Sequence, residues 1–294
     1  MENLNSCLVC GHSQFSTLFS CNDYVATGEH FQLQRCNNCS FLFTNPRPET
    51  SEIGRYYKSD QYISHAGNKA GLMYNIYDVV RNYSIKKKLA LIKRFHTSGK
   101  LMDLGCGLGD FLNGVRKDGV FEFVGVDISE DAIKHVKNKF GLNVLNENHL
   151  DSLQQNSFDV ITQWHVLEHV QLLNERIVQL KRLLKPNGTL FIAVPNSDSW
   201  DAKYYKEYWD AYDVPRHLYH FNQKSFILLM EKHGLNVLET HPLVFDAPYV
   251  SMRSETHQKH LFPFLRGGFI GLISTVMAQK KNDYSSLLFV VKNA

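Results

Sequence analysis

The sequence predicts an α/β fold, in which a largely parallel sheet carries helices on both faces. From Lys100 onward, short apolar segments alternate regularly with amphipathic helical segments, and this order is typical of parallel sheets. Residues 101–104 read as a buried strand that runs into a glycine-rich turn and then a helix. A second apolar segment, residues 123–126, ends in Asp127. Both strand ends are expected at one edge of the sheet, where α/β proteins bind their ligands.

Length and composition limit the kind of protein this can be. With 294 residues, 44% of them hydrophobic, the chain suits one large domain or a standard domain with a small attachment. The net charge of +3 is too small to indicate a nucleic-acid partner. No apolar run approaches the ~20 residues of a membrane span, and residues 1–5 do not resemble a signal peptide. We therefore expect a cytoplasmic protein, either a monomer or a homodimer.

The first 48 residues carry four of the six cysteines as two C-x-x-C pairs, 25 residues apart. Each pair is followed by a residue that permits a turn, Gly11 or Ser40. Four thiolates suit a tetrahedral structural zinc ion, and without a metal a segment this short would hardly hold a core. We predict that residues 1–48 form a zinc-binding module; the alternative is a metal-free fold with unpaired thiols. The predicted ligands are Cys7, Cys10, Cys36 and Cys39.

Residues 49–98 are expected to form a helical lead-in or lid, because Ile85, Leu89 and Ile92 follow a helical spacing. After the turn, residues 111–117 predict a helix. Ser129 is a suitable N-cap for the next helix, and Gly141 ends it. The remaining strands are expected at residues 142–145, 158–162, 189–194, 235–238 and 286–291, with one helix after the strand at 158–162 and another, residues 223–232, before the strand at 235–238.

The glycine-rich turn differs from a dinucleotide-binding turn. Its glycines alternate at 105, 107 and 109, and Asp103 lies two residues before the first of them. A carboxylate there would repel a pyrophosphate but suits a cationic group. Asp127, 18 residues after Gly109, can accept hydrogen bonds from a ribose diol. A ligand with an ammonium group and a ribose but no bridging phosphate fits S-adenosylmethionine (SAM).

With this turn the sequence resembles the class I SAM-dependent methyltransferases. The resemblance implies a Rossmann-like seven-stranded sheet over residues 99–294. Residues 163–170 also resemble the ubiquinone-biosynthesis-like O-methyltransferases, in which a Leu-Glu-His-Val stretch recurs. An ordinary surface loop remains the alternative for Asn148 and His149, which the family places near the adenine. The implied cofactor-binding residues are Asp103, Gly105, Cys106, Gly107, Gly109, Asp127, Ile128, Asn148, His149, Gln163 and Trp164.

Two insertions interrupt the second half of the domain. Residues 196–222 crowd aromatic, acidic and histidine side chains together and resemble the Pro-Arg-His-Leu segment of bacterial methyltransferases, many of which belong to surface-sugar or secondary-metabolite pathways. We expect this insertion to face the substrate. Residues 242–284 are long enough for a lid or extra helices. The predicted substrate contacts are Tyr205, Trp209, Arg216, Tyr219 and His220.

Methylation of a hydroxyl requires a base, and histidine is the usual one near neutral pH. We rank His217 first and His165 second, with Tyr205 or Tyr219 as orienting groups. Glu168 and His169 suit catalysis and the opening of a helix equally well.

The leading functional hypothesis is methyl transfer from SAM to a small molecule, at a hydroxyl of a sugar or a related metabolite. One alternative is C-methylation of a nucleotide-linked sugar, because a family with that activity also places a four-cysteine segment before its SAM domain. Methylation of ribosomal RNA is disfavoured by the acidic module, whose net charge is −1. A SAM-binding protein without turnover is the last alternative.

Overall fold

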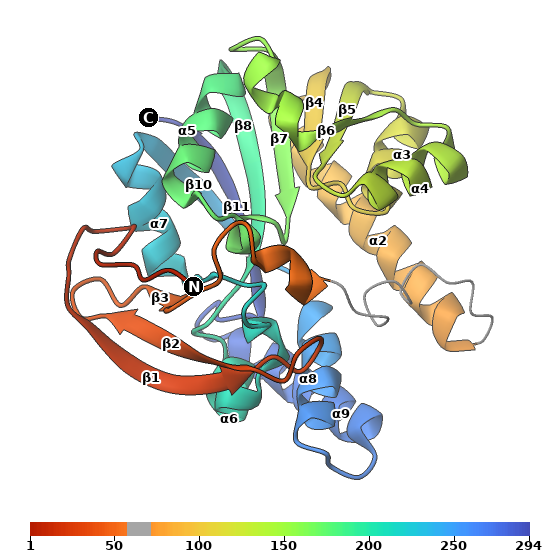
Figure 1. Cartoon of the computed structure of the whole chain (residues 1–294). Coiled ribbons are helices and arrows are strands. Elements are labelled where there is room, and N and C mark those ends of the chain that lie inside the picture. The colour runs from red at the N-terminus through yellow and green to blue at the C-terminus, as the bar shows by residue number, and fades with distance from the viewer. Residues whose placement is uncertain (58–71) are drawn as a thin grey trace.

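A seven-stranded mixed sheet forms the centre of the molecule (Figure 1). The computed structural model describes residues 1–57 and 72–294, and for residues 72–77 it describes the backbone alone. The strand order is β10-β11-β8-β7-β4-β5-β6, and only β11 runs against its neighbours. The predicted fold class is therefore confirmed. The strands are β4 (Gly99–Leu104), β5 (Phe121–Asp127), β6 (Val144–Asn146), β7 (Phe158–Trp164), β8 (Leu184–Pro195), β10 (Leu235–Pro242) and β11 (Ser286–Asn293).

Helices cover both faces of this sheet because successive strand residues point to opposite sides. Leu101 packs with α2 and α3, whereas Met102 packs with α5 and α7. The predicted caps of α4 are present: Ser129 accepts a hydrogen bond from the amide of Ala132, and Gly141 has φ 67°. The helices are α2 (Leu72–Phe95), α3 (Asp110–Asp118), α4 (Glu130–Phe140), α5 (Leu173–Leu183) and α7 (Gln223–Lys232).

A second sheet holds the N-terminal segment, with the order β1-β2-β3-β9. Strands β1 (Phe15–Asn22), β2 (His30–Cys36) and β3 (Leu42–Thr44) come from the predicted zinc module, whereas β9 (Tyr219–His220) comes from the first insertion. In this pairing Leu42 lies opposite His220 and Phe43 opposite Tyr219. The module is thus joined to the rest of the molecule by a shared sheet. Of the predicted lead-in, residues 58–71 lie outside the described residues.

Both insertions contain helices, which were anticipated only for the second, as one of two alternatives. The first holds α6 (Trp200–Tyr205) and the short turns η4 (Lys206–Tyr208) and η5 (Asp210–Tyr212). The second holds α8 (Asp246–His257) and α9 (Pro263–Ala278), which project from the body as a hairpin (Figure 1). Two further turns, η2 (Glu147–Ser152) and η3 (Leu167–His169), follow β6 and β7, and η1 (Ile53–Tyr57) follows the module. Across residues 1–57 and 72–294, none of the helices combines the length and apolarity needed to traverse a bilayer.

Candidate functional site

The glycine-rich turn joins β4 to α3 at the carboxyl edge of the sheet. Gly105 has φ 79° and Gly109 has φ 76°, a region that side chains disfavour. A Cβ atom on Gly105 would lie 2.4 Å from Cγ2 of Val166, and one on Gly109 would lie 2.7 Å from Cγ2 of Val136. Only glycine therefore fits at either position. The turn also packs directly against the segment that follows β7.

Asp103 lies at the end of β4 and is 1% exposed. Its Oδ1 accepts a hydrogen bond of 2.6 Å from the Thr162 hydroxyl, whereas its Oδ2 has no hydrogen-bond partner among the described residues. Burial raises the pKa of Asp103 to about 7, against the lowering by the Thr162 hydrogen bond and the Lys88 charge. A cationic ligand group beside Oδ2 would stabilise the ionised carboxylate.

Asp127, at the end of β5, holds the two adjoining turns in place. Its carboxylate accepts hydrogen bonds from the amides of Gly107 at 2.7 Å and Ser129 at 2.9 Å. Burial raises the pKa of Asp127. Ile128 beside it is 72% exposed, and Asn148 and His149 are exposed in η2 at the next strand end. Exposed apolar and polar groups thus border this edge of the sheet.

The end of β7 carries buried polar atoms without partners. Neither polar atom of the Gln163 amide nor Nε1 of Trp164 has a hydrogen-bond partner among the described residues. Buried polar groups are nearly always paired, so a group of unpaired ones at a strand edge marks the place of a polar ligand. Nζ of Lys88, from α2, lies 4.0 Å from the centroid of the Trp164 ring. Cys106, which the sequence analysis named as a cofactor-binding residue, is buried beside Gly125.

A cleft of about 360 Å³ opens beside this edge, a volume suited to a small molecule. It is lined from the ends of β8 and β11, from η5 and α8, and from the loop between β1 and β2. Its lining includes His165, Glu168, Asp213, Arg216, His217 and Asp246. Both histidines that were ranked as candidate bases therefore share one cleft.

His165 lies between two carboxylates. Its Nδ1 is 3.4 Å from Oε1 of Glu168, and its Nε2 is 3.2 Å from Oδ2 of Asp246. Burial opposes the imidazolium, but the two carboxylates together raise the pKa of His165 to about 9. At neutral pH this ring is therefore a cation and cannot accept a further proton.

Glu168, His169 and His217 form a cluster next to His165. The Glu168 side chain is fully buried, and neither carboxylate oxygen has a hydrogen-bond partner among the described residues. His217 Nδ1 donates a hydrogen bond of 2.8 Å to the carbonyl of Ala211, which leaves Nε2 as the basic nitrogen. The rings of His169 and His217 lie 4.4 Å apart, and burial lowers the pKa of His169 to about 4. Ligand atoms of the three residues lie within 4.8 Å of one another, a spacing at which they could hold a cation.

Four of the five predicted substrate contacts do not line this cleft. All four are buried, and each side chain is hydrogen-bonded inside the protein. Tyr219 and His220 belong to β9 and bind to the N-terminal segment, whereas Tyr205 and Trp209 bind within the insertions. The partners are Glu255 for Tyr205 at 3.0 Å, Asp201 for Trp209 at 2.8 Å, Arg47 for Tyr219 at 2.6 Å and Thr44 for His220 at 3.1 Å. The aromatic side chains of this insertion therefore pack against other parts of the protein and do not face the cleft.

Arg216, the fifth, lines the cleft but is 2% exposed and fully paired. Its guanidinium binds Asp23 at 3.0 Å, Asp213 at 2.6 Å and the carbonyl of Tyr56 at 2.9 Å. Asp23 belongs to the loop between β1 and β2, and it also accepts hydrogen bonds from three amides of that loop. Arg216 therefore fixes the N-terminal loop against the first insertion.

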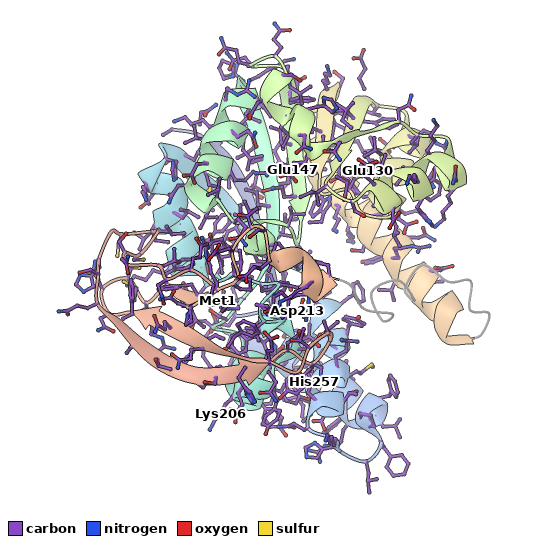
Figure 2. All side chains as sticks on the ribbon, in the orientation of Figure 1. Met1, Glu130, Glu147, Lys206, Asp213 and His257 are labelled. Carbon is purple, nitrogen blue, oxygen red and sulfur yellow. The ribbon has the colours of Figure 1, made fainter. Side chains whose placement is uncertain are left out.

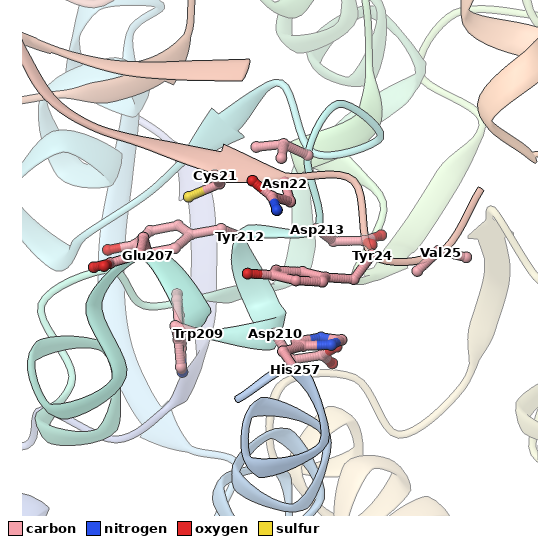
Figure 3. A pocket seen from close by; sticks show the side chains of 11 residues that line it. Cys21, Asn22, Tyr24, Val25, Glu207, Trp209, Asp210, Tyr212, Asp213 and His257 are labelled. Carbon is pink, nitrogen blue, oxygen red and sulfur yellow. The ribbon is translucent and has the colours of Figure 1, made fainter. Parts of the chain in front are cut away.

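The fixed loop forms one wall of the cleft. Val25 lines it, and the Tyr24 ring stacks on the His257 ring at a centroid distance of 4.1 Å (Figure 3). Asp213 and His257, the last residue of α8, lie beside the N-terminal sheet (Figure 2), and both line a small pocket with Tyr24. Sequence reasoning did not find Val25 or Asp246 as site residues, because neither belongs to a motif and both reach the cleft through tertiary contacts.

The four predicted zinc ligands come together. Sγ of Cys7 lies 3.5 Å from Sγ of Cys39, and Sγ of Cys10 lies 3.5 Å from Sγ of Cys36, with all four within 4.8 Å of one another. Zinc–sulfur bonds of about 2.3 Å in a tetrahedron require sulfur atoms about 3.8 Å apart. The turn residues Gly11 and Ser40 have φ 75° and 64°, as such turns need. The cluster therefore fits a zinc ion.

Comparisons with known proteins agree with this geometry. Residues 78–240, more than half of the chain, match a family described as "Methyltransferase domain". The chain is 34% identical over 112 residues to a ubiquinone biosynthesis O-methyltransferase of Methylococcus capsulatus, covering 34% of this chain and 46% of that protein. It is 25% identical over 191 residues to the Pelagibacter ubique protein of that name, covering 58% of this chain and 78% of that one. The chain thus spans about half the length of the first relative.

A solved structure supports the fold alone. A SAM-dependent methyltransferase from Thermotoga maritima superimposes with a TM-score of 0.50 at 15% sequence identity, over 76% of this chain and 95% of that chain.

Proposed function

The chain belongs to the methyltransferase domain family, and we propose that it transfers the methyl group of SAM to a hydroxyl group of a small polar acceptor, a sugar or a related metabolite. The observation that carries the proposal is the fully buried Glu168 carboxylate, which lines the cleft: its Oε1 faces the His165 ring at 3.4 Å, whereas its Oε2 has no hydrogen-bond partner among the described residues. Burial opposes the charged form, but the hydrogen bond and charge of the His165 ring lower the pKa of Glu168 below its ordinary value, so that the group is ionised. An ionised acceptor-only group suits a ligand that offers hydroxyl donors.

The strand edge suits SAM. Asp103 would hold the ammonium group and Asp127 the ribose hydroxyls, while Ile128, Asn148 and His149 would border the adenine. The orphaned amide of Gln163 and Nε1 of Trp164 offer further hydrogen bonds. When bound, SAM supplies a methyl group on a positively charged sulfur. The glycine turn keeps side chains out of the space that the ligand would fill.

In the proposed mechanism, Nε2 of His217 would take the proton of the acceptor hydroxyl, which prepares the oxygen to receive the methyl group that SAM would supply from the neighbouring strand edge. The hydrogen bond from Nδ1 to Ala211 fixes the tautomer that this role needs. Glu168 orients the acceptor by accepting its hydrogen bonds. His165, the second-ranked base, is better suited as a cation to bind an acceptor oxygen. Positioning of the reacting groups supplies most of the remaining rate enhancement.

We also propose that a structural zinc ion is bound by Cys7, Cys10, Cys36 and Cys39. The ion would hold the turns from which β1 and β2 extend. Its part in the reaction would be indirect, because the wall that contains Val25 depends on those strands.

The function is tested by measuring release of S-adenosylhomocysteine (SAH) in the presence of sugars, nucleotide sugars, phenols and RNA. We expect turnover with a polyhydroxylated small molecule, and product NMR that shows a new O-methyl group. A new C–CH₃ group on a nucleotide sugar would support the C-methylation alternative, and turnover with RNA alone would support ribosomal-RNA methylation. SAH binding without turnover on any acceptor would support a non-catalytic role.

The base is tested with His217→Ala, which we expect to lower kcat by about 10²-fold or more while the SAH dissociation constant stays within about twofold. His241→Ala, at a partly exposed histidine of β10, is the matched control and should leave kcat unchanged. Unchanged turnover in His217→Ala would contradict the assignment.

A further inference from the structure

The α8–α9 hairpin packs with its small residues inward. A Cβ atom on Gly267 would lie 2.3 Å from Cα of Met252, and one on Gly271 would lie 2.3 Å from Cα of Pro248. The two helices are therefore in direct backbone contact. The residues that α9 buries are Gly267, Gly271, Ser274 and Ala278.

The large apolar side chains of the same segment point outward. Leu261 is 82% exposed, Leu265 is 76% exposed and Phe262 is 73% exposed. Five more follow along the exposed side of α9, each between 46% and 66% exposed: Phe264, Phe269, Leu272, Val276 and Met277. This surface, residues 261–277, is called here the α9 face.

This arrangement of small and large apolar residues is the reverse of that found in helices at a water-exposed surface. A helix on the surface of a water-soluble protein turns its large apolar residues to the core and its polar residues to solvent. Small residues at the helix–helix contact and large apolar residues outside are instead typical of helices surrounded by lipid, where burying Leu or Phe between helices gains nothing over the lipid itself. The α9 face therefore indicates an apolar environment on its outer side.

Basic residues stand at both ends of the α9 face. Lys259 precedes the helix, and Lys280 and Lys281 follow it. Residues 257–281 contain no aspartate or glutamate. The nearest carboxylate in the hairpin, Glu255, is fully buried and paired with His260 and Arg266. An apolar surface with cationic ends complements an anionic lipid interface.

The same charges disfavour a second copy of the chain as the partner. An antiparallel pairing of two α9 helices would bring Lys259 of one copy beside Lys280 and Lys281 of the other, and like charges at an interface oppose association. The 16 residues of α9 are also too few to cross a bilayer. A helix of this length with an apolar outer side lies in the plane of the interface.

We propose that the α8–α9 hairpin docks the protein on an anionic lipid bilayer, with the α9 face buried among the headgroups and upper acyl chains. The inference does not depend on the reaction. If the proposed function also holds, docking brings the α8 wall of the cleft, which includes Asp246, Tyr249 and Arg253, next to the membrane.

The test is co-sedimentation of the full chain with vesicles of equal parts phosphatidylglycerol and phosphatidylcholine, compared with pure phosphatidylcholine. We expect binding to the anionic vesicles that weakens as salt is added. The variant Leu265→Ser/Phe269→Ser/Leu272→Ser should bind at least about tenfold more weakly. Lys280→Glu/Lys281→Glu should lose about tenfold or more on anionic vesicles.

The matched control is Leu172→Ser/Val178→Ser, which removes two apolar side chains that are 62% and 57% exposed elsewhere; it should bind like the unsubstituted chain. Circular dichroism and light scattering check the fold and the mass of each variant. Undiminished sedimentation of both hairpin variants would overturn the proposal. So would a dimer that the triple serine variant converts to monomer, with no vesicle binding by the unsubstituted chain.

Discussion

At the scale of single residues, Asp103 is a buried group whose charge is only partly compensated. Its carboxylate is buried, and one oxygen has no hydrogen-bond partner among the described residues. A residue kept in this state lowers the stability of the ligand-free protein and becomes favourable only when a cation binds beside it. Its pKa of about 7 makes both effects depend on pH near neutrality.

We predict that SAH binds about tenfold more weakly at pH 6 than at pH 8, because protonation of Asp103 removes the charge that holds the ammonium group. Asp103→Asn should weaken binding by about 30- to 150-fold at pH 8 and abolish the pH dependence. Isothermal titration calorimetry measures both. Asp118→Asn, in α3, is the control with unchanged affinity. A wild-type affinity that does not change between pH 6 and pH 8 would contradict the assignment.

The same substitution should stabilise the ligand-free protein. A carboxyl group whose folded pKa is raised from 3.8 to about 7 binds its proton more tightly when folded, so stability falls as pH rises between these values and the full cost is present above pH 7. Asp103→Asn removes that cost. We expect its Tm to exceed that of the wild type at pH 8 by more than at pH 5, as measured by scanning calorimetry without ligand.

At the scale of elements, Arg216 joins three segments that are distant in sequence: the β1–β2 loop, η1 and the first insertion. Asp23 and Arg216 are 193 residues apart. Spacing along the chain gives no signal for such a pair. Arg216 was therefore interpreted from its local motif alone, as a substrate contact. By contrast, the glycine turn, Asp127 and the cysteine pairs were predictable because each depends on residues that are neighbours in sequence.

We predict that Arg216→Met lowers the free energy of unfolding by about 3–5 kcal/mol, because it leaves the buried Asp23 and the partly buried Asp213 without their cation. Arg216→Lys keeps the charge but loses the fork geometry, so its loss should be intermediate. Arg55→Met breaks an exposed ion pair with Glu29 and should cost less than about 1 kcal/mol. Urea denaturation measures all three. Equal losses in Arg216→Met and Arg55→Met would show that the buried cluster contributes no more than a surface pair.

At the scale of the whole molecule, the proposed cofactor and acceptor sites are built from different parts of the chain. The edge predicted to bind SAM is built from β4, β5 and β7, whereas the acceptor cleft also needs the N-terminal sheet and the α8–α9 hairpin (Figure 1). The strand–helix alternation made the first part predictable in order and extent. The second part was not, since η5, α8 and the β1–β2 loop reach the cleft through tertiary contacts that no local pattern encodes. Strand boundaries also differ: β8 begins at Leu184, directly after α5, whereas the sequence predicted this strand from residue 189.

We predict that removing zinc separates the two activities. Cys36→Ser should lose the metal, measured by elemental analysis, and lower Tm, because metal binding and folding of such modules are coupled. Below its Tm, the variant should retain SAH affinity within about threefold and lose acceptor turnover. Cys21→Ala, at a buried cysteine outside the cluster, should keep its zinc. Loss of SAH binding and turnover together would contradict the separation.

The pairing of β3 with β9 has an evolutionary consequence. If a recombination event exchanged the first 48 residues for a cysteine-rich segment of another protein, Tyr219 and His220 would lose the strand edge to which they are matched. Arg216 would keep its charge but lose the acid that reaches it from across the junction. An exchange of that kind would therefore be expected to disrupt the joint unless both of its sides were replaced together.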